Sequence, residues 1–371
     1  LRELIAKEQD LDGVVVCTPD HWHANASVYA LRHGKHVFCQ KAMAHTIAEA
    51  GAMARAARET GLATQVAVMN EASKATRLLT EWVAAGVIGQ VREVHNWSQR
   101  PSLQGGGTWP QGLDRPKGTP LVPAGLDWDL WLGPAPDRPY NPAYLPFVWR
   151  GWLDFGEGAI GDMGNYSFDT MFRVLELTAP TAVEASSTPR FKETFPAAEM
   201  VHWEFPARHG ALGGERAPVV IHWYDDHLRP PRPVELAAGE AMNESDGEGM
   251  LYVGDKGKIL CGFEGSHPRL IPDSRMKSFV PPPDTLPASP GAYQEWLHAI
   301  RGGPMPRANF EFEQPVVEAL LLGCIAAQAS DKLYWDSASK RITALASGSA
   351  SALEAANAMI NPPSRAPWQL A

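Results

Sequence analysis

One lysine of this sequence stands in an otherwise apolar stretch, FCQKAMA at residues 38–44, directly after a strand-like run. An ammonium group in such surroundings is costly unless it is paired, so Lys41 either extends to water or has a chemical role. Further along, GDMGNYS at residues 161–167 places Asp162 and Tyr166 four residues apart, on one face of a helix. A lysine, a carboxylate and a phenol form an acid/base set, in which the ammonium favours the ionised phenol. The spacing fits equally well an Asp162 that caps the helix and a Tyr166 that packs against a sheet.

Aromatic side chains gather between these two stretches. Tryptophans stand at positions 97, 109, 128, 131, 149 and 152. They indicate either an aromatic-walled site, with Trp109 at the substrate, or ordinary aromatic packing. Trp149 and Arg150 come shortly before the Asp162 helix, and Arg150 is suited to clamp a phosphate or carboxylate or to stack on the tryptophans.

Metal and thiol chemistry have less support in the sequence. His21 and His23 flank Trp22 at a helix start, but no third ligand of suitable spacing follows, so hydrogen bonding is favoured over a metal site. The four cysteines have no CxxC spacing, and we expect neither a disulfide framework nor a zinc site.

Length and composition indicate a globular protein of two domains. The chain has 371 residues, of which 44% are hydrophobic and 20% charged. A net charge of −9 without a basic run argues against a nucleic-acid surface. No stretch reads as a membrane span or a signal peptide, and localisation stays open between cytoplasm and periplasm. The expected partner is a small molecule, with no nucleic acid and no membrane.

Strands and helices alternate over the first 70 residues. Apolar runs predict strands at residues 12–18, 35–39 and 63–68, and the segments between them predict helices at 20–32 and 46–60. The first strand reads as buried on both faces, and Asp20 is expected to cap the first helix. This order predicts a parallel βαβ sheet, whose ligand crevice lies at the carboxyl ends of the strands. The residues that follow those ends are Thr18, Gln40, Lys41 and Asn70.

The pattern changes near residue 90. Residues 92–98, 200–205 and 219–224 alternate between apolar and polar side chains, which is typical of an antiparallel sheet with one covered face. We expect a parallel-sheet domain at 1–90 and an α+β domain at 91–371. A Pro-, Gly- and Trp-rich section, residues 101–152, separates the first two of these strands, and a loop of that length is more often functional than idle.

Several of these motifs together resemble the Gfo/Idh/MocA oxidoreductases. The matching motifs are VCTPDHWH at 16–23, QKA at 40–42, TQ at 64–65, WR at 149–150, GDMG at 161–164 and VGDKG at 253–257. The likeness extends over nearly the whole chain, and it is the order and spacing of the motifs that make it specific.

The resemblance implies a Rossmann domain followed by an open-faced, mainly antiparallel sheet with helices on one side, which carries the substrate site and often an oligomer interface. Family members bind NAD or NADP and move hydride between the nicotinamide and a carbon of a sugar, polyol or related alcohol. Lys41 corresponds to the family's active-site lysine, and Asp162 and Tyr166 to an aspartate and the residue four positions on, usually histidine. The expected cofactor contacts are Thr18, Pro19, His23, Gln40, Lys41, Asn70, Trp149 and Arg150. The expected substrate contacts are Lys41, Trp109, Arg150, Asp162 and Tyr166.

The sequence departs from the family pattern in three respects. The fingerprint GxGxxG after the first strand and the acidic residue after the second are absent, so we expect the chain to begin late in the fold. At about 30 residues per βα unit, it lacks on the order of 60 residues. Gln40 and Ala42 replace a glutamate and a proline, which is expected to lower the pKa of Lys41 and to remove a rigid, sometimes cis, constraint. Tyr166 replaces the histidine and needs Lys41 nearby to act as a base.

Three functions fit these residues. The first is an NAD(P)-dependent oxidoreductase of a sugar, polyol or glycoside, in which Tyr166 is the base, Lys41 assists it and Asp162 orients the substrate. The second is an NAD-dependent glycosidase or lyase that works through transient sugar oxidation, suggested by the Trp-rich loop. The third is a non-catalytic binding protein on a degenerate dehydrogenase frame, suggested by the missing fingerprint.

Overall fold

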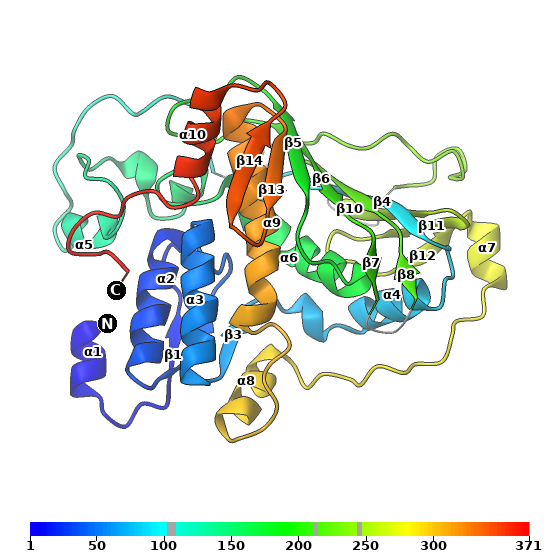
Figure 1. Ribbon diagram of the computed structural model, residues 1–371, viewed down its shortest axis with the longest axis horizontal. Helices are drawn as coiled ribbons and strands as arrows, with labels where there is room; N and C mark the ends of the chain where they lie inside the picture. The colour runs from blue at the N-terminus through cyan, green and yellow to red at the C-terminus, as the bar shows by residue number, and fades with distance from the viewer. Residues whose placement is uncertain (102–108, 211–213, 243–246, 371) are drawn as a thin grey trace.

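Two sheets organise the chain, which is described here from a computed structural model (Figure 1). The structure describes residues 1–101, 109–210, 214–242 and 247–370, so residues 102–108 of the long Trp-rich section lie outside it. A three-stranded parallel sheet comes first, and a nine-stranded mixed sheet follows. The short strands β7 (Arg208–His209) and β8 (Glu215–Arg216) pair with each other and form a separate two-stranded sheet.

The small sheet has the predicted βαβ arrangement. Its strands, in spatial order, are β1 (Gly13–Val16), β2 (His36–Cys39) and β3 (Thr64–Val66), and all pair in parallel. The helices before and between them are α1 (Arg2–Lys7), α2 (Asp20–Arg32) and α3 (Ile47–Thr60). Figure 1 shows these blue elements together on the left of the molecule. The carboxyl ends of β1 and β2 therefore meet at one edge, as the sequence pattern predicted.

The helices α2 and α3 start differently from one another. The residue before α2 is Pro19, and no side chain caps this helix, so the prediction that Asp20 caps it is wrong. Asp20 is instead the first helical residue, and its carboxylate accepts a hydrogen bond from the backbone of Ala42. In α3, Thr46 and Glu49 form a reciprocal capping box, which satisfies backbone donors that the first turn leaves free.

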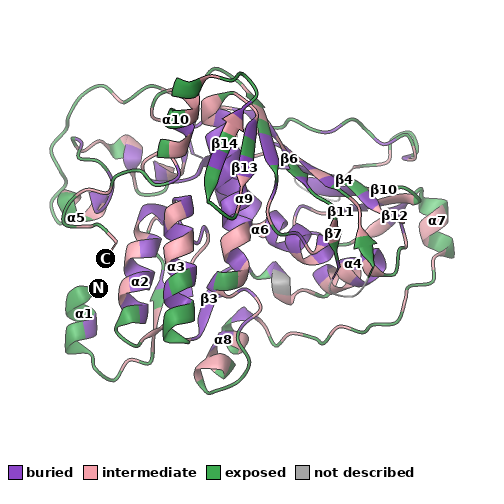
Figure 2. Cartoon of the chain, viewed as in Figure 1, coloured by how far each residue is buried: buried purple, intermediate pink, exposed green. Residues whose placement is uncertain are grey.

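Strand β1 forms one edge of the small sheet and is covered on one face only. Val16 is 4% exposed, whereas Val15 is 53% exposed, so the prediction of a strand buried on both faces is wrong at Val15. The central strand β2 is covered on both faces, and Figure 2 shows buried residues in purple along the neighbouring helix α2. Phe38 of β2 packs on Tyr293 and Trp296 of α8 (Ala292–Ile300), with ring centroids 4.6 and 5.6 Å away.

The nine-stranded sheet confirms the predicted second architecture. Its order is β12-β11-β10-β4-β9-β6-β5-β13-β14, and only the β4–β9 pair is parallel among the recorded strand pairs. The strands are β4 (Val91–Trp97), β5 (Ala182–Ser187), β6 (Glu199–Phe205), β9 (Val219–Tyr224), β10 (Gly249–Gly254), β11 (Gly257–Cys261), β12 (Arg269–Ile271), β13 (Leu333–Asp336) and β14 (Arg341–Leu345). The fold is a Rossmann-type parallel sheet followed by an open-faced, mainly antiparallel sheet.

Long helices cover one face of the large sheet (Figure 1). These are α6 (Gly158–Leu175) and α9 (Phe310–Ala329), with α4 (Lys74–Ala84) packed against α6. Trp203 of β6 points into this layer and donates a hydrogen bond from Nε1 to the carbonyl of Ala319, 2.7 Å away. A Cβ at Gly323 would lie 2.4 Å from the Trp203 ring, so glycine is needed for this close approach.

The remaining helices are short. They are α5 (Trp128–Leu132), α7 (Asp273–Ser278), α10 (Ala350–Ala358) and the 3-10 turns η1 (Asn70–Ala72), η2 (Pro142–Tyr144) and η3 (Val148–Gly151), of which η1 and η3 contact α6. Within the described ranges, no helix combines the length and the apolar character that crossing a membrane requires.

Candidate active site

Lys41 lies at the carboxyl end of β2 and turns toward α6 rather than toward water. Its Nζ donates hydrogen bonds to the backbone carbonyl of Asp162 at 2.6 Å and to Oδ1 of the same residue at 2.7 Å. The Lys41 side chain is 10% exposed, so it does not extend into solvent. The Lys41–Ala42 peptide bond is cis although Ala42 is not a proline. The buried lysine is thus paired, as its apolar setting requires.

Helix α6 presents Asp162 and Tyr166 to the same cation. They are one turn apart, and Lys41 Nζ lies 4.7 Å from the ring centroid of Tyr166 while it bonds Asp162. The helix begins at Gly158, so Asp162 is an interior residue and not a cap. The structure therefore brings together the three residues of the predicted acid/base set, with the ammonium over the face of the phenol ring.

Arg150 supplies a second cation to Asp162. Its Nε donates to Oδ1 at 2.9 Å, the oxygen that also accepts from Lys41. The guanidinium carbon lies 4.3 Å from the ring centroids of both Phe147 and Trp149. Arg150 therefore pairs with the carboxylate and stacks on aromatic rings at once, and Phe147, at 44% exposed, is the ring that faces solvent.

The charged states of Lys41 and Asp162 are stabilised by each other and by the neighbouring Tyr166 and Arg150. Burial lowers the pKa of Lys41, but Asp162 and Tyr166 outweigh burial, so the net pKa is raised above the usual lysine value. Burial raises the pKa of Asp162, but Lys41 and Arg150 outweigh it and hold the net pKa below the usual value. The pKa of Lys41 is thus raised even with the uncharged Gln40 beside it, because Asp162 provides a negative charge from another element. Lys41 is an ammonium and Asp162 a carboxylate at neutral pH.

Most of the tryptophans form a packed cluster and not an open wall. Trp109 is fully buried and donates from Nε1 to Oε1 of Gln111 at 2.7 Å. Trp149 and Trp152 are also buried, and the half-buried Trp128 and Trp131 rings stack 4.9 Å apart. Aromatic packing, the second reading of these residues, is what the structure shows for them.

The two histidines after β1 bind backbone carbonyls. His23 is fully buried, with Nε2 2.7 Å from the carbonyl of Thr18 and Nδ1 in contact with the carbonyl of Ala42. It ties together the loops that follow β1 and β2. His21 lies 3.0 Å from the carbonyl of Trp131 through Nε2 and 3.3 Å from that of Phe155 through Nδ1. Both imidazole rings hold backbone segments in place through hydrogen bonds to carbonyl groups. His23 was predicted as a cofactor contact, but both of its ring nitrogens contact carbonyl groups of the protein.

Asn70 also acts through the backbone of α6. Its Nδ2 donates to the carbonyl of Tyr166 at 2.7 Å and to Oγ1 of Thr170 at 2.6 Å. The residue is 6% exposed, so it holds the turn that carries Tyr166. At the strand ends, Thr18 is exposed, and Pro19 and Gln40 are half-buried, which leaves these three predicted cofactor contacts accessible.

Three carboxyl groups near Lys41 were not identified as site residues from the sequence. Asp20, Glu157 and Glu264 each interact electrostatically with Lys41. Burial, together with the nearby Asp162 charge, raises the pKa of Asp20 to about 7. Burial raises the pKa of Glu157 well above the usual value, and its two carboxyl oxygens have no hydrogen-bond partner among the described residues. Asp20 could have been found, because it lies in the same motif as Thr18.

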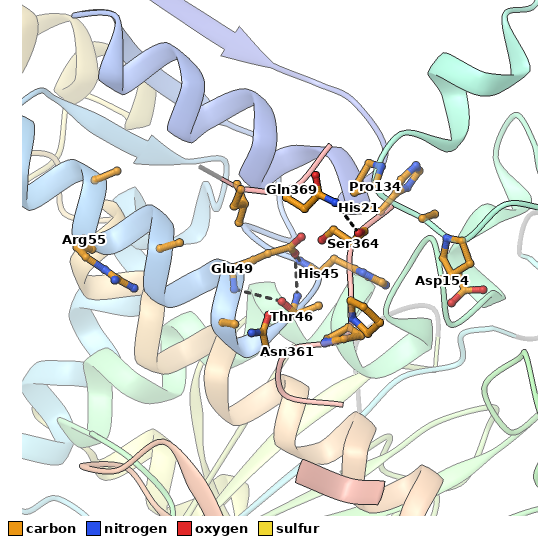
Figure 3. A pocket seen from close by; sticks show the side chains of 18 of the residues that line it. His21, His45, Thr46, Glu49, Arg55, Pro134, Asp154, Asn361, Ser364 and Gln369 are labelled. Atoms are coloured by element: carbon orange, nitrogen blue, oxygen red, sulfur yellow. Dashed lines mark hydrogen bonds between the residues drawn. The ribbon is translucent and has the colours of Figure 1, made fainter. Parts of the chain in front are cut away.

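A cavity of about 560 Å³ lies beside the site, at the start of α3 (Figure 3). His45 and Glu49 line it from one side, and Asn361 and Ser364 of the C-terminal segment line it from another. Burial raises the pKa of Glu49 to about 7 and lowers that of His45 to about 4. Lys41, Asp162 and Tyr166 are not among its lining residues, so the acid/base set faces a different space.

A glycine-rich stretch at the start of α6 does not form a dinucleotide loop. GEGAIG at residues 156–161 has the GxGxxG spacing, but it follows η3 and not a strand. Its glycines are packed against protein: a Cβ at Gly156 would lie 2.7 Å from Cα of Arg150, and one at Gly161 would lie 2.0 Å from Cβ of Glu157. At the ends of β1 and β2, Thr18, Gln40 and Lys41 offer a hydroxyl, an amide and an ammonium, and these residues stay predicted contacts for the nicotinamide end of NAD(P).

Two family models match the chain, in the order of the two sheets. The model of the oxidoreductase-family NAD-binding Rossmann fold matches residues 1–68. The model of the oxidoreductase-family C-terminal alpha/beta domain matches residues 106–206. Both belong to the Gfo/Idh/MocA group, which agrees with the motifs that the sequence carries.

Two curated relatives are similar over part of the chain. A levoglucosan dehydrogenase of Pseudarthrobacter phenanthrenivorans is 29% identical over 103 residues, which is 26% of this chain and 26% of that protein. A 1,5-anhydro-D-fructose reductase of Ensifer adhaerens is 37% identical over 120 residues, which is 31% of this chain and 34% of that protein. The matched segments thus span between a quarter and about a third of these relatives.

The fold itself is matched more widely. The WlbA dehydrogenase of Chromobacterium violaceum, solved with NADH and UDP-GlcNAcA, superposes with a TM-score of 0.58 at 17% identity, covering 91% of this chain and 81% of that one. The two family models, the curated relatives and the fold support the same assignment, and the sequence motifs around Lys41 and Asp162 agree with it. This chain belongs to the Gfo/Idh/MocA family of oxidoreductases.

Proposed function

We propose that the protein is an NAD(P)-dependent oxidoreductase that acts at a hydroxyl-bearing carbon of a sugar or anhydro-sugar. The observation that carries this proposal is the position of the Lys41 ammonium, held by Asp162 and lying over Tyr166 at the carboxyl end of β2. The NAD-binding Rossmann match supports the cofactor class. The names of the two relatives, which act on levoglucosan and 1,5-anhydro-D-fructose, support the substrate class.

Tyr166, Lys41 and Asp162 have different roles in the transfer of the substrate hydroxyl proton. A bound NAD(P)⁺ would supply the acceptor for the hydride that leaves the substrate carbon. The oxygen of Tyr166, in its ionised form, takes the proton of the hydroxyl on that carbon, and Lys41 stabilises the negative charge that passes between the two oxygens. Asp162 keeps Lys41 in place through Oδ1, and in the described part of the chain no donor is recorded for Oδ2, which is suited to accept from a second substrate hydroxyl.

The competing functions predict different products. The described tryptophans of the loop that motivated glycoside cleavage are buried or half-buried in aromatic packing, so no specific observation favours that function. We would incubate the protein with NAD⁺ or NADP⁺ and levoglucosan, glucose or inositol, and in reverse with NADH or NADPH and 1,5-anhydro-D-fructose. Equimolar reduced nicotinamide and keto-sugar would support the proposal. Cleavage without net cofactor change, or tight cofactor binding without any turnover, would contradict it.

A further inference from the structure

Three histidines form a row across the large sheet, away from the candidate active site. His95 on β4 pairs in register with His222 on β9, and His222 pairs in register with His202 on β6. The rings of His95 and His222 are 13° from parallel with centroids 4.6 Å apart, and those of His202 and His222 are 4.7 Å apart. Glu93 precedes His95 by two residues on the same strand and points to the same face.

This row lies on the face that the long helices leave open. Trp203 and Ile221, which are fully buried, alternate with the histidines and point toward the α6 and α9 layer. His95, His202 and His222 point the other way and are half-buried, and the Glu93 side chain is 49% exposed. A ligand from solvent can therefore reach the carboxylate without passing through the core.

The hydrogen bonds of the rings leave one nitrogen of each of two histidines turned toward Glu93. Nδ1 of His95 lies 3.0 Å from the hydroxyl of Tyr224, and Nδ1 of His222 lies 2.6 Å from Nδ1 of His202. Their Nε2 atoms lie 3.3 Å and 3.8 Å from Oε2 of Glu93. The second distance is too long for a hydrogen bond, and the buried Nε2 of His222 has no hydrogen-bond partner among the described residues.

We propose that Glu93, His95 and His222 form a binding site for a divalent transition metal, with zinc the best fit, and that His202 and Tyr224 orient the two imidazoles. A zinc ion holds nitrogen and oxygen ligands at about 2.0–2.1 Å, which in a tetrahedral site puts the ligand atoms about 3.3–3.5 Å apart. The three ligand atoms all lie within 4.8 Å of one another, so small side-chain rotations close the site.

The ligand atoms of Glu93, His95 and His222 are satisfied better by one metal ion than by a proton shared among them. A proton on Nε2 of His95 satisfies Glu93 but leaves Nε2 of His222 without a partner, whereas one metal ion satisfies all three ligand atoms. Outer partners that hold the second ring nitrogen, such as Tyr224 and His202, are typical of metal-bound histidines. The neighbouring cation Lys258 is paired with Glu235 at 2.8 Å.

The test uses zinc and cobalt chlorides with the chelator-treated full chain, and it does not depend on the proposed oxidoreductase activity. We expect one Zn²⁺ per chain at micromolar or tighter affinity, a rise in Tm of about 3 °C or more, and the intense visible absorption of tetrahedral Co²⁺. Glu93→Gln and His222→Gln should each weaken binding at least 100-fold. His202→Phe should weaken it by about 10- to 100-fold, because it removes only an outer partner.

The controls separate the site from surface histidines and from misfolding. His209 faces Glu215 at 3.0 Å with both side chains exposed, so His209→Gln should leave zinc affinity unchanged. Glu93→Gln alters an exposed side chain, and its Tm without metal should equal that of the unaltered protein. Absence of one-to-one zinc binding in the micromolar range would overturn the proposal, as would undiminished binding by Glu93→Gln and His222→Gln.

Discussion

The ammonium of Lys41 lies 2.7 Å from Oδ1 of Asp162, although 121 positions separate the two residues in the chain. This contact joins the parallel sheet to the helix layer of the second sheet. It also explains how a lysine is kept charged in an apolar setting, because the buried carboxylate and ammonium compensate each other only at hydrogen-bonding distance.

Replacement of Lys41 is the most direct test of the site. Lys41→Ala removes the cation that stabilises the developing negative charge, so kcat/KM for the sugar substrate should fall by about 10²- to 10³-fold. Lys35→Ala is the matched control, because Lys35 is half-buried outside the site and, among the described residues, its Nζ donates to the backbone carbonyl of Gln9 and to no site residue. Steady-state kinetics of both variants give the comparison, and a Lys41→Ala protein with undiminished turnover would show that the assignment is wrong.

Replacement of Arg150 by lysine shows whether the site needs only a positive charge beside Asp162 or also the planar guanidinium group. Arg150→Lys keeps the positive charge but loses the planar group that stacks between Phe147 and Trp149. We expect KM to rise about tenfold with a smaller change in kcat, because the remaining Lys41 contact still holds the Asp162 carboxylate.

The control for Arg150 is another arginine–carboxylate pair. Arg115 donates from Nε to Glu193 at 2.8 Å outside the site, and Arg115→Lys should leave both kinetic constants unchanged. Equal effects of the two substitutions would show that the loss at Arg150 is general destabilisation.

Asp20 should make stability depend on pH. Burial raises its pKa to about 7 in the folded protein, against a usual value near 3.8. The folded state therefore holds a proton that the unfolded chain has released, so this contribution is fully present below about pH 4 and is lost as the pH rises to about 7. Asp20→Asn mimics the protonated form, keeps an acceptor for the Ala42 backbone, and should stabilise the fold at pH 7 by about 4 kcal/mol while changing little at pH 4.

Denaturant unfolding at pH 4, 5.5 and 7 measures this difference. Asp10→Asn is the control, because Asp10 is exposed and should leave the pH dependence as it is. If Asp20→Asn and the unaltered protein lose stability in parallel between pH 4 and 7, the carboxyl of Asp20 is not the group responsible.

The sequence was informative about local patterns and less so about contacts between distant segments. The strand end at Gln40 and Lys41, and the shared helix face of Asp162 and Tyr166, follow from periods of two and 3.6 residues. The sharing of Oδ1 by Lys41 and Arg150 does not, because it depends on how η3 packs against α6.

Two further features show the same limit. Asp20 has the residue type and position of a helix cap, and only the docking of the Ala42 loop makes it a buried carboxyl with a raised pKa. The tryptophans around position 130 have the composition of a sugar-binding wall, but they pack on one another once the loop folds. Composition gives the side chains available, whereas burial is decided by tertiary contacts.

Tyr166→Phe distinguishes the hydroxyl of this residue from its ring. Phenylalanine keeps the aromatic face that lies 4.7 Å from Lys41 Nζ, so the ammonium and the Asp162 contact should stay in place. If the hydroxyl accepts the substrate proton, kcat should fall by about 10²-fold or more, while KM and Tm change little. A substitution that leaves kcat intact would show that Tyr166 only packs against Lys41, and the proton would then have to go to another group near the ammonium, such as Asp20 or Glu264. The double variant Tyr166→Phe/Asp20→Asn would identify which, because it should lose turnover only if Asp20 had taken over the proton.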